Sequence, residues 1–124
     1  MKRQDLAGEP VPRWPKASRE LAAFRAAVDH LGPEAKIPDG PPVTNVVELL
    51  ECVAMGEGVA FLPASAADLY KRREVVYVPV SDITPSHVAV AWPEASRSRA
   101  TAAFVRAAVE SAKERRPAVV AALA

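Results

Sequence analysis

The sequence predicts an α/β fold in which helices flank a mixed sheet. Segments with the apolar spacing of helices alternate with segments rich in β-branched residues, and residues 58–63 form an unbroken apolar run between a glycine and a proline. Such a run is typical of a strand buried on both faces, which favours a parallel or mixed sheet. With 124 residues, 50% of them hydrophobic, the chain can bury one core.

Two helices are expected on the N-terminal side of this strand. They follow residues 9–15, where three prolines favour an edge strand or an extended loop. Ser18 suits the cap of a first helix with apolar residues at helical spacing, which are Leu21, Phe24, Val28 and Leu31. A second helix is expected from Asn45, which has Glu48 three residues later as in a capping box, to Gly56, which suits a left-handed stop.

Two more strands and a long helix are expected after residue 63. Ser65 begins a short helical turn, and residues 75–80 and 87–92 are rich in β-branched residues. A helix follows Pro93, and cations near its C-terminal end suit the helix dipole. Residues 118–124 are an apolar tail, which either joins a protein contact or is disordered.

Charge and cysteine content exclude several classes of protein. Lys and Arg number 16 and Asp and Glu number 15, so the net charge of +1 creates no overall field that attracts nucleic acid or acidic membranes. No apolar run is long enough for a membrane span, and the first residues do not resemble a signal peptide. We therefore expect a cytoplasmic protein. The single Cys52 cannot form an internal disulfide.

No set of residues for catalysis or metal binding emerges from the sequence. His30 and His87 are far apart and lack neighbours at zinc-ligand spacing. Cys52 lies inside the expected second helix beside acidic residues, which disfavour a reactive thiolate. Gly56 and Gly58 come before a strand, whereas the glycines of a dinucleotide-binding loop follow one. We expect neither an enzyme nor a bound metal or cofactor.

A candidate ligand site lies at the start of the first helix. Trp14 and Lys16 come shortly before Ser18, where the free N–H groups of the first helical turn can bind an anion. This arrangement could hold a small carboxylate. The alternative is that Trp14 only packs and Ser18 only caps the helix. Thr44 and Asn45, at the start of the second helix, leave the same two interpretations open.

Three segments, in their amino-acid sequence and in their order along the chain, resemble segments of a known protein family. The segments are Asp5-Leu-Ala-Gly-Glu-Pro10, Val53-Ala-Met-Gly-Glu-Gly-Val-Ala-Phe-Leu-Pro63 and Val88-Ala-Val-Ala-Trp92 before a final helix. They resemble the C-terminal part of the effector-binding domain of LysR-type transcriptional regulators, most specifically over residues 56–63. In that family two α/β subdomains, similar to type 2 periplasmic binding proteins, enclose a small effector, and two crossing strands join them.

The resemblance implies how the chain is divided. Residues 1–117 form a partial effector-binding domain, in which residues 5–92 are the second subdomain with a hinge strand and residues 93–117 are a helix that returns to the first subdomain. Residues 118–124 are the tail. The resemblance does not extend to the helix-turn-helix or to the opening part of the effector domain. We therefore expect DNA binding only through a helix-turn-helix domain that is absent from this sequence.

The resemblance also assigns residues. The effector-binding residues would be Trp14, Pro15, Lys16, Ser18 and Thr44. The hinge would include Ala91 and Trp92. The apolar face of the last helix would normally pack on the absent subdomain, and leaving it in water is costly. We therefore expect a homodimer in which a second copy covers Phe104, Val105 and Ala108.

These expectations define a function and one alternative. The chain is expected to be an effector-sensing regulatory domain that binds a small organic anion and responds by a population shift between open and closed states. The alternative is a truncated protein-interaction or dimerisation module that needs no ligand of its own. Binding of a small carboxylate by the isolated chain would distinguish the first from the second.

Overall fold

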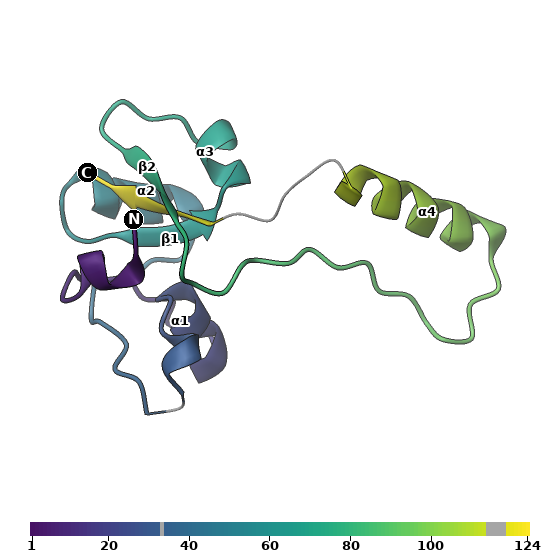
Figure 1. The fold of residues 1–124 in the computed structure, drawn as a ribbon, viewed down its shortest axis with the longest axis horizontal. Coiled ribbons are helices and arrows are strands. Elements are labelled where there is room, and N and C mark those ends of the chain that lie inside the picture. The colour runs from purple at the N-terminus through teal and green to yellow at the C-terminus, as the bar shows by residue number, and fades with distance from the viewer. Residues whose placement is uncertain (33, 114–118) are drawn as a thin grey trace. The chain divides into compact units, whose positions relative to one another are not determined.

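The computed structural model describes residues 1–32, 34–113 and 119–124. These residues divide into two compact units: one holds residues 1–85 and 119–124, and the other holds residues 86–113. The first unit is an α/β structure, as predicted, built on a three-stranded open sheet (Figure 1).

The sheet is antiparallel, whereas the sequence predicted a mixed one. Its strands are β1 (Ala60–Pro63), β2 (Val76–Val80) and β3 (Val119–Leu123), in the order β1-β3-β2. Ala121 is the partner of Phe61 in β1 and of Val78 in β2, and both pairings are antiparallel. The strand that joins the other two is therefore the last one in the chain.

Residues 119–123 form strand β3, whereas the sequence predicted that residues 118–124 are a tail; residue 118 lies outside the described residues. Val120, Ala121 and Ala122 are all buried, and the two alanines have no exposed surface. A central strand is covered on both edges and both faces, which suits small side chains where helices pack closely. The composition of this segment, mostly Ala and Val, is equally compatible with a helix or a free tail, so only the tertiary pairing determines its structure.

The sheet separates two hydrophobic clusters. Successive residues of a strand point to opposite faces, and accordingly Phe61 and Ala121 belong to one cluster while Ala60 and Ala122 belong to the other. The first cluster includes Leu6 of the short helix η1 (Arg3–Leu6) and packs against the partly buried Ala23 of α1 (Arg19–Arg25). The second cluster is filled largely by α2 (Val46–Ala54). Figure 1 shows these helices with α3 (Ser65–Leu69) around the sheet.

Helix α1 begins where the sequence predicts but ends early. The hydroxyl of Ser18 accepts a hydrogen bond from the backbone N–H of Leu21 at 3.3 Å, which confirms Ser18 as the N-cap. The helix stops at Arg25, so Val28 and Leu31 lie outside it, the latter in the short helix η2 (Asp29–Leu31). Their spacing was therefore wrongly interpreted as a continuous helix.

Helices α1 and α2 end in the same backbone motif. The left-handed residue is Gly56 after α2, with a φ of 74°, as predicted, and Ala27 after α1, with a φ of 53°. After α1, Val28 N–H donates to the carbonyl of Ala23 and Ala27 N–H donates to the carbonyl of Phe24, both at 3.0 Å, which is the Schellman pattern. Because Ala27 and Val28 are buried, core packing compensates for the strain of a left-handed alanine.

The second unit consists of an extended segment followed by helix α4 (Arg99–Lys113). The sequence predicted a strand over residues 87–92, but these residues pair with no strand in the part of the chain that the structure describes. Val88 is 99% exposed and Trp92 is 49% exposed. A high β-propensity does not form a strand without a partner, so the hinge role of Ala91 and Trp92 stays a prediction.

Candidate functional site

A pocket of about 310 Å³ lies in the first unit beside Trp14, within the usual size range of small-molecule sites. Its lining comes from the segment before α1, from α1 itself and from the loop before α2. The residues that give it its chemistry are Arg13, Trp14, Pro15, Arg25, Ile37 and Asp39. The pocket therefore combines an indole ring and two guanidinium groups with one carboxylate.

The backbone around Trp14 is fixed by hydrogen bonds on both sides. Arg13 forms a parallel bridge with Pro42: its N–H donates to the carbonyl of Pro41 at 2.9 Å, and its carbonyl accepts from the N–H of Val43 at 2.8 Å. A turn follows, in which Ala17 N–H donates to the carbonyl of Trp14 at 2.9 Å. The prolines of this segment keep it extended, so the indole has a defined position.

Arg25 lies over the face of Trp14. Its guanidinium carbon is 4.0 Å from the centroid of the ring, which is within the range of a cation–π interaction. Burial lowers the pKa of Arg25 from its ordinary value. Arg25 forms no hydrogen bond or ion pair with the other described residues, so its N–H groups are available to a ligand.

The second guanidinium of the pocket is already engaged. Arg13 donates from Nε to the carbonyl of Gly40 at 3.1 Å and lies 3.0 Å from Oδ1 of Asp39. Asp39 therefore has its own cation, and Arg25 remains the cation that a bound anion can approach. The carboxylate of Asp39 is 86% exposed, so water screens its repulsion of an anion.

The structure brings together two of the five predicted effector-binding residues. Trp14 and Pro15 line the pocket, whereas Lys16 and Ser18 do not. Lys16 is exposed on the turn, and the hydroxyl of Ser18 caps α1. Arg25 was missed because no local pattern links it to Trp14: the contact arises from the turn that folds residue 14 back onto the end of α1.

The hydroxyl of Thr44, the remaining predicted residue, is occupied within the chain. It lies 2.9 Å from Oε2 of Glu48, and Thr44 N–H donates to the same atom at 2.7 Å. Asn45 caps α2 by accepting from Glu48 N–H at 3.0 Å, as predicted. Glu48 thus receives the reciprocal bond of the capping box from Thr44 N–H, one residue before the N-cap.

Cys52 does not have the setting of a nucleophile. Burial raises the pKa of its thiol, and a hydrogen bond and the negative charge of Glu57 raise it further. Within the described residues no group of three or more His, Cys, Asp and Glu side chains is placed to hold a metal ion. Nor does any helix in that part of the chain have the length and apolar character needed to cross a membrane.

An α/β unit with a pocket lined by an aromatic ring and an available cation is typical of domains that bind small molecules. The family model described as the LysR substrate binding domain matches residues 1–113, and the chain belongs to that family. Neither the curated proteins nor the solved structures yield a match to this chain. Membership implies an effector-sensing regulatory role and a periplasmic-binding-protein-like fold.

Proposed function

We propose that this domain senses a small organic anion through the pocket beside Trp14. The observation that supports the proposal best is the guanidinium of Arg25, stacked at 4.0 Å on the indole and without another described partner. A guanidinium binds a carboxylate through two parallel N–H donors. The stacking on Trp14 orients that pair of donors before a ligand arrives, which reduces the entropy lost on binding.

The rest of the pocket suits an apolar or aromatic body attached to the anionic group. Pro15, Ala22 and Ile37 provide apolar walls next to the indole of Trp14. A ligand of this shape would bury its apolar part against these walls and pair its carboxylate with Arg25. The proposed ligand class is therefore a small carboxylate with a planar or apolar body.

The regulatory consequence would be a population shift. An effector that binds one arrangement of the domain more tightly biases the equilibrium by its difference in affinity for the two states. In an intact regulator, we propose, this shift changes the arrangement of subunits on DNA through a helix-turn-helix domain. Ala91 and Trp92 are the proposed hinge of that motion.

Calorimetric titration of the full chain with a panel of small carboxylates tests the proposal. For a carboxylate that binds, Arg25→Gln should weaken affinity by about tenfold, the value of one charge-assisted hydrogen bond. Arg73→Gln, at an exposed arginine outside the pocket, is the matched control and should bind as the unaltered chain does. Binding that both variants retain equally would refute the site.

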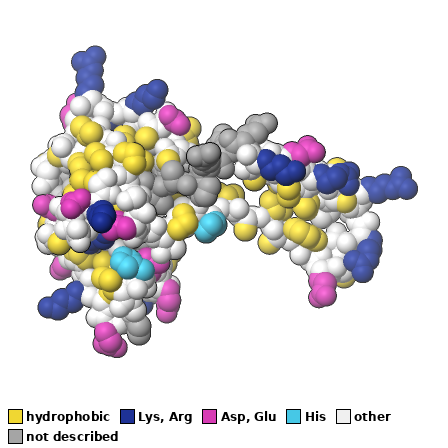
Figure 2. All heavy atoms as spheres, viewed as in Figure 1, with side chains coloured by type: hydrophobic (Ala, Val, Ile, Leu, Met, Phe, Trp, Pro, Cys, Tyr) yellow, Lys and Arg dark blue, Asp and Glu magenta, His cyan; other side chains and the backbone are white. Residues whose placement is uncertain are grey.

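A second proposal concerns self-association through α4. Phe104 is 65% exposed and Val109 is 52% exposed, on a helix with a marked apolar face. Figure 2 shows hydrophobic side chains gathered among lysines and arginines on the unit that holds α4. We propose that a second copy of the chain covers Phe104, Val105 and Ala108, because exposed apolar surface of this kind favours association.

A further inference from the structure

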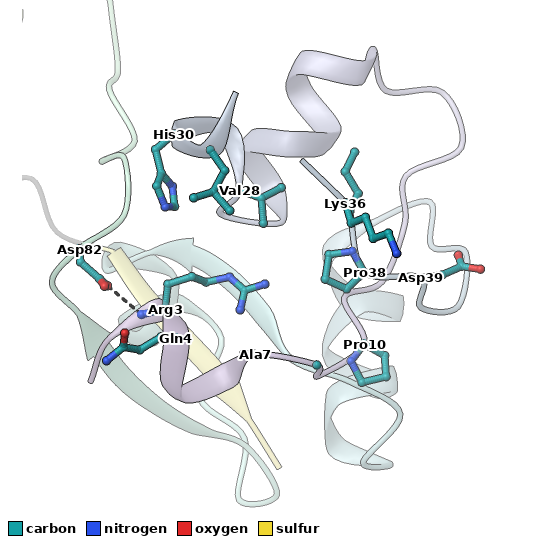
Figure 3. A pocket seen from close by; sticks show the side chains of 13 residues that line it. Arg3, Gln4, Ala7, Pro10, Val28, His30, Lys36, Pro38, Asp39 and Asp82 are labelled. Atoms are coloured by element: carbon teal, nitrogen blue, oxygen red, sulfur yellow. Dashed lines mark hydrogen bonds between the residues drawn. The ribbon is translucent and has the colours of Figure 1, made fainter. Parts of the chain in front are cut away.

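A second and larger cavity, of about 770 Å³, lies in the first unit next to the start of the chain (Figure 3). Its walls come from η1, from the residues after α1 and from residues 36–39. Pro10 lines this cavity, whereas the smaller pocket begins one residue later at Val11. The two cavities share only Ile37, Pro38 and Asp39, so they have no cationic residue in common.

Arg3 provides a fixed cation on the wall of this cavity. Its Nε donates to the carbonyl of Ala26 at 3.3 Å and its Nη1 donates to the carbonyl of Leu6 at 3.0 Å. The guanidinium carbon also lies 5.2 Å from the centroid of the Phe61 ring. A guanidinium has five N–H donors, so three of them remain without an acceptor among the described residues. The side chain is held in place while still able to donate.

The surroundings of Arg3 leave its charge incompletely balanced. Burial lowers the pKa of Arg3 from its ordinary value, and the negative charge of Asp82 opposes this effect. Asp82 is itself engaged, because its Oδ1 accepts from the backbone N–H of Arg3 at 2.7 Å, as the dashed line in Figure 3 shows. The other carboxylate of the wall, Asp39, pairs with Arg13 outside this cavity.

Two further nitrogen-bearing side chains line the same cavity without partners. Lys36 and His30 both lie on its wall, and neither side chain forms a hydrogen bond or ion pair with the residues that the structure describes. Figure 3 shows His30 beside Val28 and Lys36 beside Pro38, with the side chain of Arg3 between these two groups. Asp39 is thus paired with a cation outside the cavity and Asp82 keeps its negative charge beside Arg3, while Arg3, Lys36 and His30 retain N–H donors without an acceptor among the described residues.

The apolar residues of the lining, like the charged ones, indicate which class of ligand fits the cavity. Leu31, which is 62% exposed, and the half-buried Ile37 form the apolar wall of the cavity, whereas Val28 is buried and adds almost no surface. An anion alone would leave this surface wet, whereas an organic anion would cover it. A monoester of phosphoric acid with an apolar body matches both features, because its dianionic head accepts charge-assisted hydrogen bonds of the kind that Arg3 and Lys36 can donate.

We propose that this cavity is a second ligand site, which binds a small organic phosphate monoester with its phosphate on Arg3 and Lys36 and its apolar body on Leu31 and Ile37. This site is separate from the pocket beside Trp14 and does not depend on the function proposed for that pocket. A domain with both sites would respond to two different metabolites.

Calorimetric titration of the full chain with phenyl phosphate tests this proposal. Lys36→Gln should weaken binding by about tenfold, and His30→Gln should also weaken it. Lys71→Gln, at an exposed lysine that does not line the cavity, should bind as the unaltered chain does. Phenol, which has the same apolar body without the phosphate, should bind at least about tenfold more weakly than phenyl phosphate, because it cannot form charge-assisted hydrogen bonds.

Arg25→Gln separates this proposal from the one above. Unchanged binding of phenyl phosphate by that variant supports a separate site, whereas loss of binding in Arg25→Gln with full binding in Lys36→Gln would overturn it. An absence of binding by the unaltered chain at millimolar phenyl phosphate would overturn it as well. Neither overturning result affects the carboxylate titration at Trp14, so the two proposals fail independently.

Discussion

The carboxylate of Glu48 accepts the backbone N–H of Thr44 at 2.7 Å and lies 2.9 Å from its hydroxyl. This pair closes the first turn of α2 and uses the hydroxyl that the sequence suggested for a ligand. The backbone hydrogen bond from Thr44 is the largest cause that lowers the pKa of Glu48, followed by the hydroxyl. The cap of α2 and the dependence of the fold's stability on acid pH are therefore linked at Glu48.

Replacing Glu48 with Gln should make the unfolding free energy less dependent on pH in the acid range. Because the folded-state pKa lies below the ordinary value, the carboxylate stabilises the fold above its unfolded-state pKa, and this contribution disappears as the pH falls through the folded-state pKa. Urea unfolding at neutral and acid pH measures the difference. Glu110→Gln, at an exposed position of α4, should retain the pH dependence of the unaltered chain.

Substituting the left-handed residues that follow α2 and α1 should change the unfolding free energy by unequal amounts. Gly56→Ala should lower the unfolding free energy by about 1–2 kcal/mol, since an added Cβ meets no atom within 4 Å and only the left-handed backbone opposes it. Ala27→Gly relieves a similar strain but removes a buried methyl group worth about 0.8 kcal/mol, so its net effect should be small. Denaturant unfolding of both variants compares them. A large loss in Ala27→Gly with none in Gly56→Ala would contradict this account.

Placing a carboxylate in β3 should unfold the sheet, because this strand joins the other two. Ala121→Asp introduces an unpaired charge at a residue with no exposed surface, and a loss of more than about 3 kcal/mol is expected. Ala124→Asp makes the same substitution at an exposed residue just after the strand and should leave the stability nearly unchanged. Circular dichroism with urea titration measures both. Equal stability of the two variants would show that β3 is not part of the sheet.

The elements that sequence predicts well are those fixed by neighbouring residues. Helix α2 follows from Asn45, Glu48 and Gly56, which all act within the helix that they bound. The strand predicted at residues 87–92 failed because β-branched residues require a partner strand. The segment that does join the sheet, β3, lies outside the residues 1–113 that match the family. No family pattern could therefore indicate its role.

The candidate site shows the same distinction between local and long-range information. Trp14 and Pro15, which line the pocket, can be proposed from sequence because an aromatic residue before a helix cap is a local pattern. Arg25 becomes part of the site only when α1 is folded against the turn that follows Arg13. Thr44 stays a predicted ligand residue, but its hydroxyl already bonds Glu48 within the chain, a pairing across four residues that the sequence pattern does not show.

A pair of matched substitutions in α4 tests the proposed self-association. Ala108→Asp places a carboxylate on the apolar face that includes Phe104 and Val105, and Ala107→Asp places one a residue earlier, outside that face. The two variants change the helix propensity and the helix dipole almost equally. Sedimentation velocity over a range of concentrations should show association by Ala107→Asp and an at least about tenfold weaker association by Ala108→Asp, because desolvating the new charge opposes contact. A chain that stays monomeric at all concentrations, or two variants that associate equally, would refute the role of this face.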